Sequence, residues 1–200
     1  MSGYKVALFF HIVGVVTLFA AMGIQQVVGA QLRSAGSVRE LRQWMQAIRP
    51  TGLALPLAAA VILISGFVMT AQQWTMSTPW IATGFVTLLA MAAIGATVLR
   101  SGFTKIGKAS AAAMHDDGPI PAETARLRAA PQLWIGMGVM DGAAVGVLWL
   151  MTTKPGGALP VAVVLVAAAI GAALGALPGV RAKPRVPVPP AWAPNSGAGR

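Results

Sequence analysis

The chain has 200 residues, of which 56% are hydrophobic and only 10% charged, and its formal net charge is +10 at pH 7. A soluble domain normally carries about 25% charged residues, so this composition excludes an ordinary soluble protein. The sequence has no Cys, which excludes disulfides, thiolate metal sites and thiol catalysis.

Five apolar segments of the sequence are each close to the roughly 20 residues that a helix needs to cross a bilayer. They lie at about 5–28, 52–71, 80–99, 132–152 and 158–180. The sequence therefore predicts an all-α fold, a polytopic membrane helix bundle with five transmembrane helices.

The basic residues are distributed unevenly between the two sides that five spans would define. Thirteen of the fifteen Lys and Arg fall within residues 33–49, 100–128 and 181–200, and only Lys5 and Lys154 fall on the other side. The positive-inside rule then predicts an external N-terminus and a cytoplasmic C-terminus. We expect the basic face to contact anionic lipid headgroups and no nucleic acid.

The first span, 5–28, has a polar face. Tyr4, His11 and Gln25 are spaced by multiples of seven, and Gly14 follows His11 by three residues, so these positions lie on one side of a helix. Polar side chains within a span usually point into the bundle, and we expect the same of this face.

Between the first two spans, Ser37 and Glu40 form a capping box before a short amphipathic pattern over 38–48. This pattern predicts either a helix lying on the cytoplasmic surface or an extension of the neighbouring spans. Trp74 and Trp80, near the second turn, and Trp149 suit an aromatic belt at the outer interface. In the third span, Thr83 and Thr87 can bond to their own backbone or to a neighbouring helix.

The longest connection is the loop 100–130. His115, Asp116 and Asp117 lie in a turn signal, HDDGP, and Pro121 can open a short helix. Three adjacent residues rarely converge on one ion, so the sequence predicts a solvated turn here and no metal site.

The fourth span, 132–152, contains Asp141 near its centre, where an Asp costs roughly 2.5–3.5 kcal/mol. A helical projection puts Trp134, Val145 and Leu148 on the side of Asp141, which predicts that this side is buried in the bundle. The opposite side should face lipid, and it holds Ile135, Val139, Ala143, Val147 and Leu150.

His11 is the only ionisable partner that the other spans offer to Asp141. Thr83, Thr87, a backbone carbonyl or water are the alternatives. Two roles stay open for Asp141, a hydrogen-bonding pin between helices and a proton carrier.

Small residues predict where helices pack closely. Gly138, Gly142 and Gly146 form a stripe on the fourth span, and Gly171, Gly175 and Gly179 form one on the fifth. The transmembrane domain is expected to end near residue 182, and the Pro-rich, basic segment 183–200 is expected to be a disordered cytoplasmic tail.

Three motifs carry a resemblance: HIVG in the first span, an SGFVMT stretch closing a Pro-containing second span, and WLMTTKPG after the fourth. Over most of residues 4–156 the chain resembles an uncharacterised bacterial family of predicted integral membrane proteins. More distantly it is similar to the copper-resistance D proteins and the membrane-bound protoporphyrinogen oxidases, which also place a His in a first helix. The first resemblance implies a multi-pass protein of the bacterial plasma (inner) membrane.

Three functions are consistent with these residues. The first is a scaffold or accessory membrane subunit without chemistry of its own, as a homo-oligomer or in a membrane complex. The second is haem b binding through His11, which the distant resemblance implies. The third is proton or metal-ion transport through Asp141, of which a copper version would use Met69, Met76 and Met151. The sequence contains no constellation of enzymatic spacing, so we do not expect an enzyme.

Overall fold

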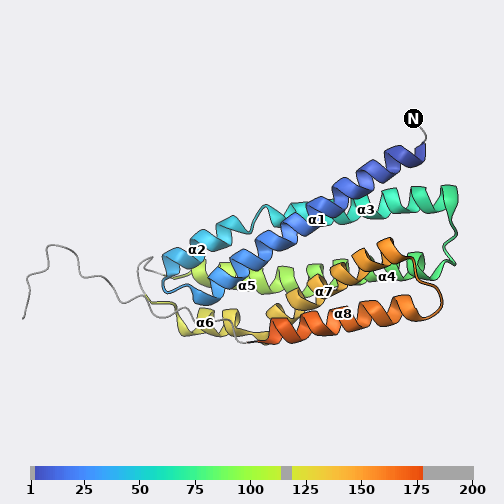
Figure 1. The fold of residues 1–200 in the computed structure, drawn as a ribbon. Coiled ribbons are helices and arrows are strands. Elements are labelled where there is room, and N and C mark those ends of the chain that lie inside the picture. The colour runs from blue at the N-terminus through green and yellow to red at the C-terminus, as the bar shows by residue number, and fades with distance from the viewer. Residues whose placement is uncertain (1–2, 114–118, 178–200) are drawn as a thin grey trace, which may run out of the picture.

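The computed structural model describes residues 3–113 and 119–177 (Figure 1). Helices and turns make up this part of the chain, and it contains no strand, which confirms the all-α prediction. The elements are α1 (Gly3–Ser34), α2 (Val38–Ala47), α3 (Thr51–Gln73), α4 (Pro79–Ile94), the π-helix η1 (Gly95–Leu99), α5 (Arg100–Ala111), α6 (Ala122–Ala129), α7 (Pro131–Thr153) and α8 (Leu159–Ala176).

Five helical stretches in the described part are long and apolar enough to cross a membrane, as the sequence predicted. They are Gly3–Ser34, Val38–Gln73, Pro79–Ala111, Ala122–Thr153 and Leu159–Ala176. Large apolar side chains such as Phe9, Phe67 and Leu165 are exposed on α1, α3 and α8. Contiguous apolar surface of this kind is typical of helices that face lipid.

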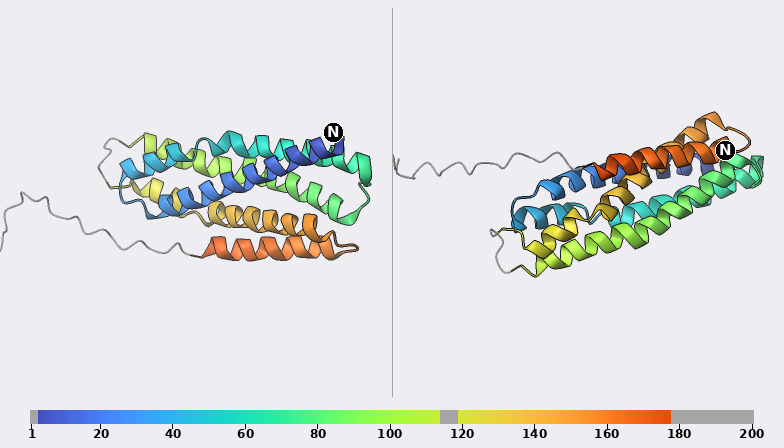
Figure 2. Two further views of the ribbon diagram at one scale, coloured as in Figure 1. Left: turned by 45° about the horizontal axis from the view of Figure 1, so that its top comes forward. Right: turned by 90° about the horizontal axis from the view of Figure 1, so that it is seen from below.

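The bundle consists of two closely packed helix pairs. α1 packs along α3, α7 packs along α8, and α4 contacts α7 (Figure 1). The N-terminus of α1, the α3–α4 turn and the α7–α8 turn lie at one end, which we call the Lys154 end, and α2, α5 and α6 lie at the other. In Figure 2, α4, η1 and α5 run as one continuous rod, and α8 lies at the edge of the bundle.

The two glycine stripes meet in the seam between α7 and α8. A Cβ added to Gly138 would overlap the carbonyl of Gly171, and one added to Gly142 would overlap the carbonyl of Ala167. A Cβ at Gly175 would overlap the carbonyl of Trp134. Without an aqueous solvent to drive helices together, such close backbone approach supplies the van der Waals contact that holds them. Gly179 lies outside the described residues.

The end opposite Lys154 has its own small core. Leu32, Leu41 and Ile106, from α1, α2 and α5, are fully buried. Ser37 caps α2, because its hydroxyl accepts a hydrogen bond from the Glu40 amide at 3.3 Å and the Glu40 carboxylate accepts one from the Gly36 amide at 2.8 Å. A short turn joins α2 to α3, so α2 extends the second span.

Residues 100–130 were expected to be a loop, and this expectation is wrong for the first part of the segment. α5 continues α4 and η1 as far as Ala111, because its residues Phe103 and Ile106 bury an apolar face against α2. α6 begins directly after Pro121, where a short helix was expected.

The side of α7 opposite Asp141 was expected to face lipid, yet Ala143 and Leu150 are buried, whereas Val145 and Leu148 are exposed. The reason is that α7 has neighbours on several sides, since it packs on α8, α4 and η1. α8, which is the fifth span, ends at Ala176. The segment 183–200, which was expected to be a disordered tail, lies outside the described residues.

Candidate functional site

A cavity of about 550 Å³ opens between α1, α3, α4 and α7 in the half of the bundle that contains the Lys154 end. Most of its lining is apolar, with Val15, Phe19, Leu63, Phe85 and Leu88 among the contributors. The size lies within the range of about 300–1,000 Å³ typical of ligand pockets.

His11 of α1 is a polar residue in the wall of this cavity. Its Nδ1 lies 3.2 Å from the Ser65 hydroxyl of α3, and that hydroxyl donates its own proton to the Val61 carbonyl at 2.5 Å. A hydroxyl has one proton, so Ser65 accepts from Nδ1–H of His11. In a neutral ring whose proton is on Nδ1, Nε2 can accept a hydrogen bond or ligate a metal.

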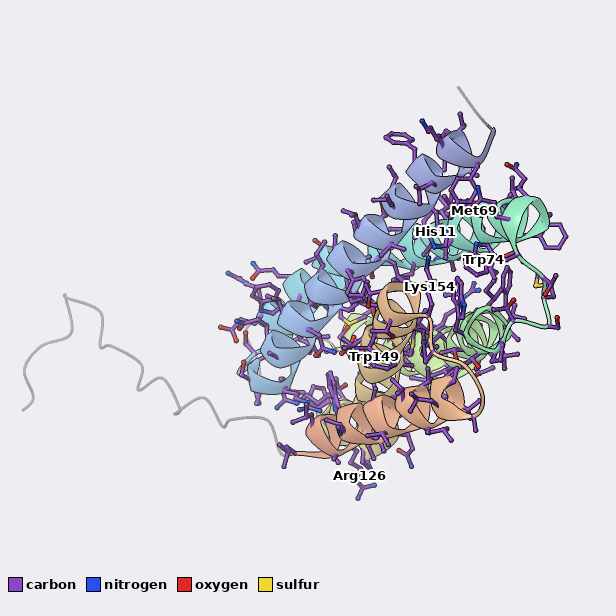
Figure 3. The ribbon with its side chains drawn as sticks, turned by 45° about the vertical axis from the view of Figure 1, so that its right-hand side comes forward. His11, Met69, Trp74, Arg126, Trp149 and Lys154 are labelled. Atoms are coloured by element: carbon purple, nitrogen blue, oxygen red, sulfur yellow. The ribbon has the colours of Figure 1, made fainter. Side chains whose placement is uncertain are left out.

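Two Trp rings and one cationic side chain, Lys154, also line the cavity. Trp74 and Trp80 make an edge-to-face pair with ring centroids 5.4 Å apart, and the Lys154 ammonium lies 5.1 Å and 5.9 Å from their rings. Figure 3 shows His11, Met69, Trp74 and Lys154 gathered at one end of the bundle, with Trp149 further along it. The rings stabilise the ammonium by cation–π attraction.

Asp141 belongs to a second, separate site. It is half-buried in α7, and its Oδ2 accepts a hydrogen bond from Nε2 of Gln26 on α1. Both residues line a crevice of about 260 Å³ between α1, α7 and α8. Arg33 and Trp134 lie in the same crevice, with the Arg33 guanidinium 4.1 Å from the Trp134 ring.

The structure separates the residues that the sequence placed together. His11 bonds to Ser65 and not to Asp141, and Gln26 follows His11 by fifteen residues, a distance of about 22 Å along a helix. Gln25 is buried and donates to the Thr51 hydroxyl at 3.3 Å. Thr83 donates to its own backbone, at the Pro79 carbonyl, and Thr87 is buried in α4.

Sequence reasoning missed the partners Gln26, Ser65 and Arg33. Arg33 and Gln26 are seven residues apart on α1, and this spacing puts both on the side that meets α7 and α8. Heptad spacing from Arg33 would therefore have indicated Gln26 as a polar residue of the same face. Ser65 carried no such signal, because it is a lone hydroxyl in an apolar span.

The described residues contain no group of three or more His, Cys, Asp or Glu side chains that could hold a metal ion. His115, Asp116 and Asp117 fall outside the described part of the chain.

Residues 5–155 match the model of a family described as predicted integral membrane proteins, DUF2269. The chain belongs to the DUF2269 family. The match covers nearly all of α1 to α7 and includes His11, Gln26, Asp141 and Lys154, whereas the α8 wall of the Asp141 crevice falls outside it. α8, with the second glycine stripe, lies outside the matched region. No curated protein and no solved structure matches the chain.

Proposed function

We propose that this DUF2269 protein is a scaffold or accessory subunit in the membrane, whose intramembrane polar residues hold its own helices together. The observation that carries the proposal is the hydrogen bond from Gln26 to Asp141, which gives the costly central carboxylate an interhelical partner. Gln25 with Thr51 and His11 with Ser65 join α1 to α3 in the same way. Polar pairs of this kind are a common means of fixing transmembrane helices.

Purification in mild detergent tests this proposal. We expect a colourless protein that brings down a defined membrane partner in constant stoichiometry, or forms a homo-oligomer of fixed mass. Asp141→Asn should assemble normally, because an Asn oxygen can accept the same bond. A protein that stays monomeric without a partner, at native expression levels in gently solubilised membranes, would contradict it.

We also infer the placement of the protein in the bacterial plasma membrane, with the N-terminus outside and the C-terminus in the cytoplasm. The asymmetry of thirteen Lys and Arg against two supports this orientation. The basic end would then meet anionic lipid headgroups. A reporter fused after Arg200 should be active only in its cytoplasmic form, and a reporter active only outside would refute the orientation.

Proton-coupled transport is a second candidate, which the crevice around Asp141 favours. Gln26 and Arg33 line this crevice toward the end that carries the basic residues, giving Asp141 a polar route in that direction. In vesicles with an internal pH dye, transport would require Asp141 and be absent in Asp141→Asn. Equal proton flux for the two proteins would exclude this role.

Haem b binding is a third candidate, supported by the position of His11 in the wall of a large cavity. A neutral imidazole is a good axial ligand to haem iron, and His11 would supply one such ligand. After expression with ample haem, a Soret band that disappears in His11→Ala would support it. Protein without a Soret band would exclude it.

A further inference from the structure

We propose that the cavity between α1, α3, α4 and α7 binds one acyl chain of an anionic phospholipid, with the lipid head group held by Lys154. The proposal goes beyond the structural role above, which assigns no ligand to this cavity. It rests on the chemistry of the lining, on the unbalanced charge of Lys154 and on the backbone of that residue.

The lining of the cavity suits a hydrocarbon chain. Apart from His11, Tyr4, Thr70, Thr152 and Lys154, its contributors are apolar, aromatic, sulfur-containing or glycine residues. A small hydrophilic ligand would leave its polar groups without partners in such a wall, at a high cost in free energy. The surrounding bilayer presents acyl chains at a far higher concentration than any other hydrophobic molecule, so mass action favours them as the occupant.

The ammonium of Lys154 carries a charge that the chain does not balance at this end. The five acidic residues of the sequence are Glu40, Asp116, Asp117, Glu123 and Asp141, and none belongs to the segments 3–12, 70–81 and 151–160 that meet here. In the described structure the contacts of the Lys154 ammonium are the rings of Trp74 and Trp80. A phosphate or other anionic head group supplies the missing countercharge.

The backbone of Lys154 points to a role for this side chain beyond ending the helix. Lys154 is the C-cap of α7 and has φ of 50°, a left-handed conformation, while its amide donates to the Leu150 carbonyl at 2.9 Å. Among the described residues it is the only one other than glycine with a positive φ. Gly or Asn would adopt this conformation with less strain. A strained backbone conformation at a residue whose side chain lines the cavity suggests a functional role for that side chain.

Native mass spectrometry of the full chain, released from nanodiscs of equal parts phosphatidylcholine and phosphatidylglycerol with identical acyl chains, tests the proposal. We expect the wild-type protein to retain one phosphatidylglycerol more than the Lys154→Gly variant, with an affinity for this lipid about tenfold higher. Lys154→Gly keeps the left-handed turn and removes the side chain together with its ammonium. Lys154→Arg keeps the charge and should retain the lipid.

A second variant tests the cavity itself. A Cβ at Gly84 would approach the mobile end of the Met151 side chain, so Gly84→Leu fills the cavity while Lys154 remains. This variant should also lose one lipid. Arg100→Gln, which removes a charge from the opposite end, is the matched control and should keep the lipid at Lys154.

Three results would overturn the proposal. Lys154→Gly could retain as much phosphatidylglycerol as the wild type. The wild type could retain phosphatidylcholine equally well. Gly84→Leu could lose no lipid although circular dichroism and gel filtration show that it is folded.

Discussion

Gln26 on α1 donates a hydrogen bond to Asp141 at the middle of α7, while its neighbour Gln25 donates to Thr51 at the start of α3. Adjacent residues on a helix point about 100° apart, so two glutamines in sequence join α1 to helices on different sides. α1 is thereby joined both to α3, its partner in one pair, and to α7 of the other pair.

Replacing Asp141 tests how much this bond stabilises the bundle. Asp141→Leu should lower the free energy of unfolding by about 0.6 kcal/mol, the average measured for interhelical hydrogen bonds in membranes, and by no more than the maximum of about 1.7 kcal/mol. Asp141→Asn should fall within a few tenths of the wild type, since its side-chain oxygen can accept from Gln26. Reversible unfolding in mixed micelles, followed by circular dichroism, gives these values.

A double-mutant cycle separates this bond from other effects of the same substitutions. Gln26→Leu and Asp141→Leu should each destabilise the protein, and the double variant should lose less than their sum. Gln25→Leu breaks the bond to Thr51 instead, so its effect should add to that of Asp141→Leu. Full additivity between positions 26 and 141 would mean that their bond contributes nothing.

The number of spans followed from the sequence because long apolar runs report directly on transfer into lipid. The partner of Asp141 did not follow, because a count of residues from Lys5 on α1 and from Lys154 on α7 gives comparable depths only if the two helices are parallel. α1 has 32 residues and crosses the bundle obliquely (Figure 1). Gln26, which that count places far deeper than Asp141, therefore meets it.

A helical projection of the sequence also could not identify which sides of α7 are buried. A single polar residue defines one inward direction, but a helix with neighbours on several sides buries residues all round. Leu150 shows this, since it is apolar, lies opposite Asp141 and is fully buried. The stripes Gly138, Gly142, Gly171 and Gly175 were readable as packing surfaces, although the sequence did not say that they pack on each other.

The capping box of α2 makes a local prediction. Ser37→Ala removes the acceptor for the Glu40 amide and should cost about 1 kcal/mol of stability, as N-cap replacements typically do. Ser37→Asp preserves an acceptor and should be close to neutral. Thermal unfolding of the two variants side by side measures the difference, and equal melting temperatures would show that the cap is unimportant.

A further prediction concerns Arg33, a residue of α1 whose side chain caps the C-terminal end of α8. Its guanidinium donates to the carbonyls of Gly175 and Leu177, at 3.0 Å and 3.3 Å, at the C-terminal end of α8. Arg33→Met should destabilise the protein by about 0.3–1 kcal/mol, since a cation there favours the helix dipole. Arg33→Lys should recover only part, because an ammonium cannot reproduce the two-nitrogen fork.

Hydrogen exchange locates the effect of Arg33. We expect faster exchange in the last turn of α8 in Arg33→Met than in the wild type, with unchanged exchange in α3. The exposed Arg100 provides the control, and Arg100→Met should leave α8 as it is. Unchanged protection of α8 in Arg33→Met would show that water satisfies these carbonyls equally well.

The seam between α7 and α8 predicts opposite effects for the same substitution at two glycines. Gly142→Ala should be destabilising, because its Cβ would overlap the Ala167 carbonyl and a backbone cannot move aside as a flexible side chain can. Overpacking of this kind costs about 1–3 kcal/mol, which exceeds the gain of about 1 kcal/mol in helix propensity from Gly to Ala. A Cβ added at Gly23 on α1 meets no atom within 4 Å, so Gly23→Ala should gain part of that helix propensity and raise the melting temperature.

Thermal unfolding in detergent compares the two variants directly. A cysteine pair introduced across the seam should cross-link more slowly in Gly142→Ala if α8 has moved away. Equal stabilisation by both substitutions would mean that α8 does not pack on α7 as closely as the structure has it.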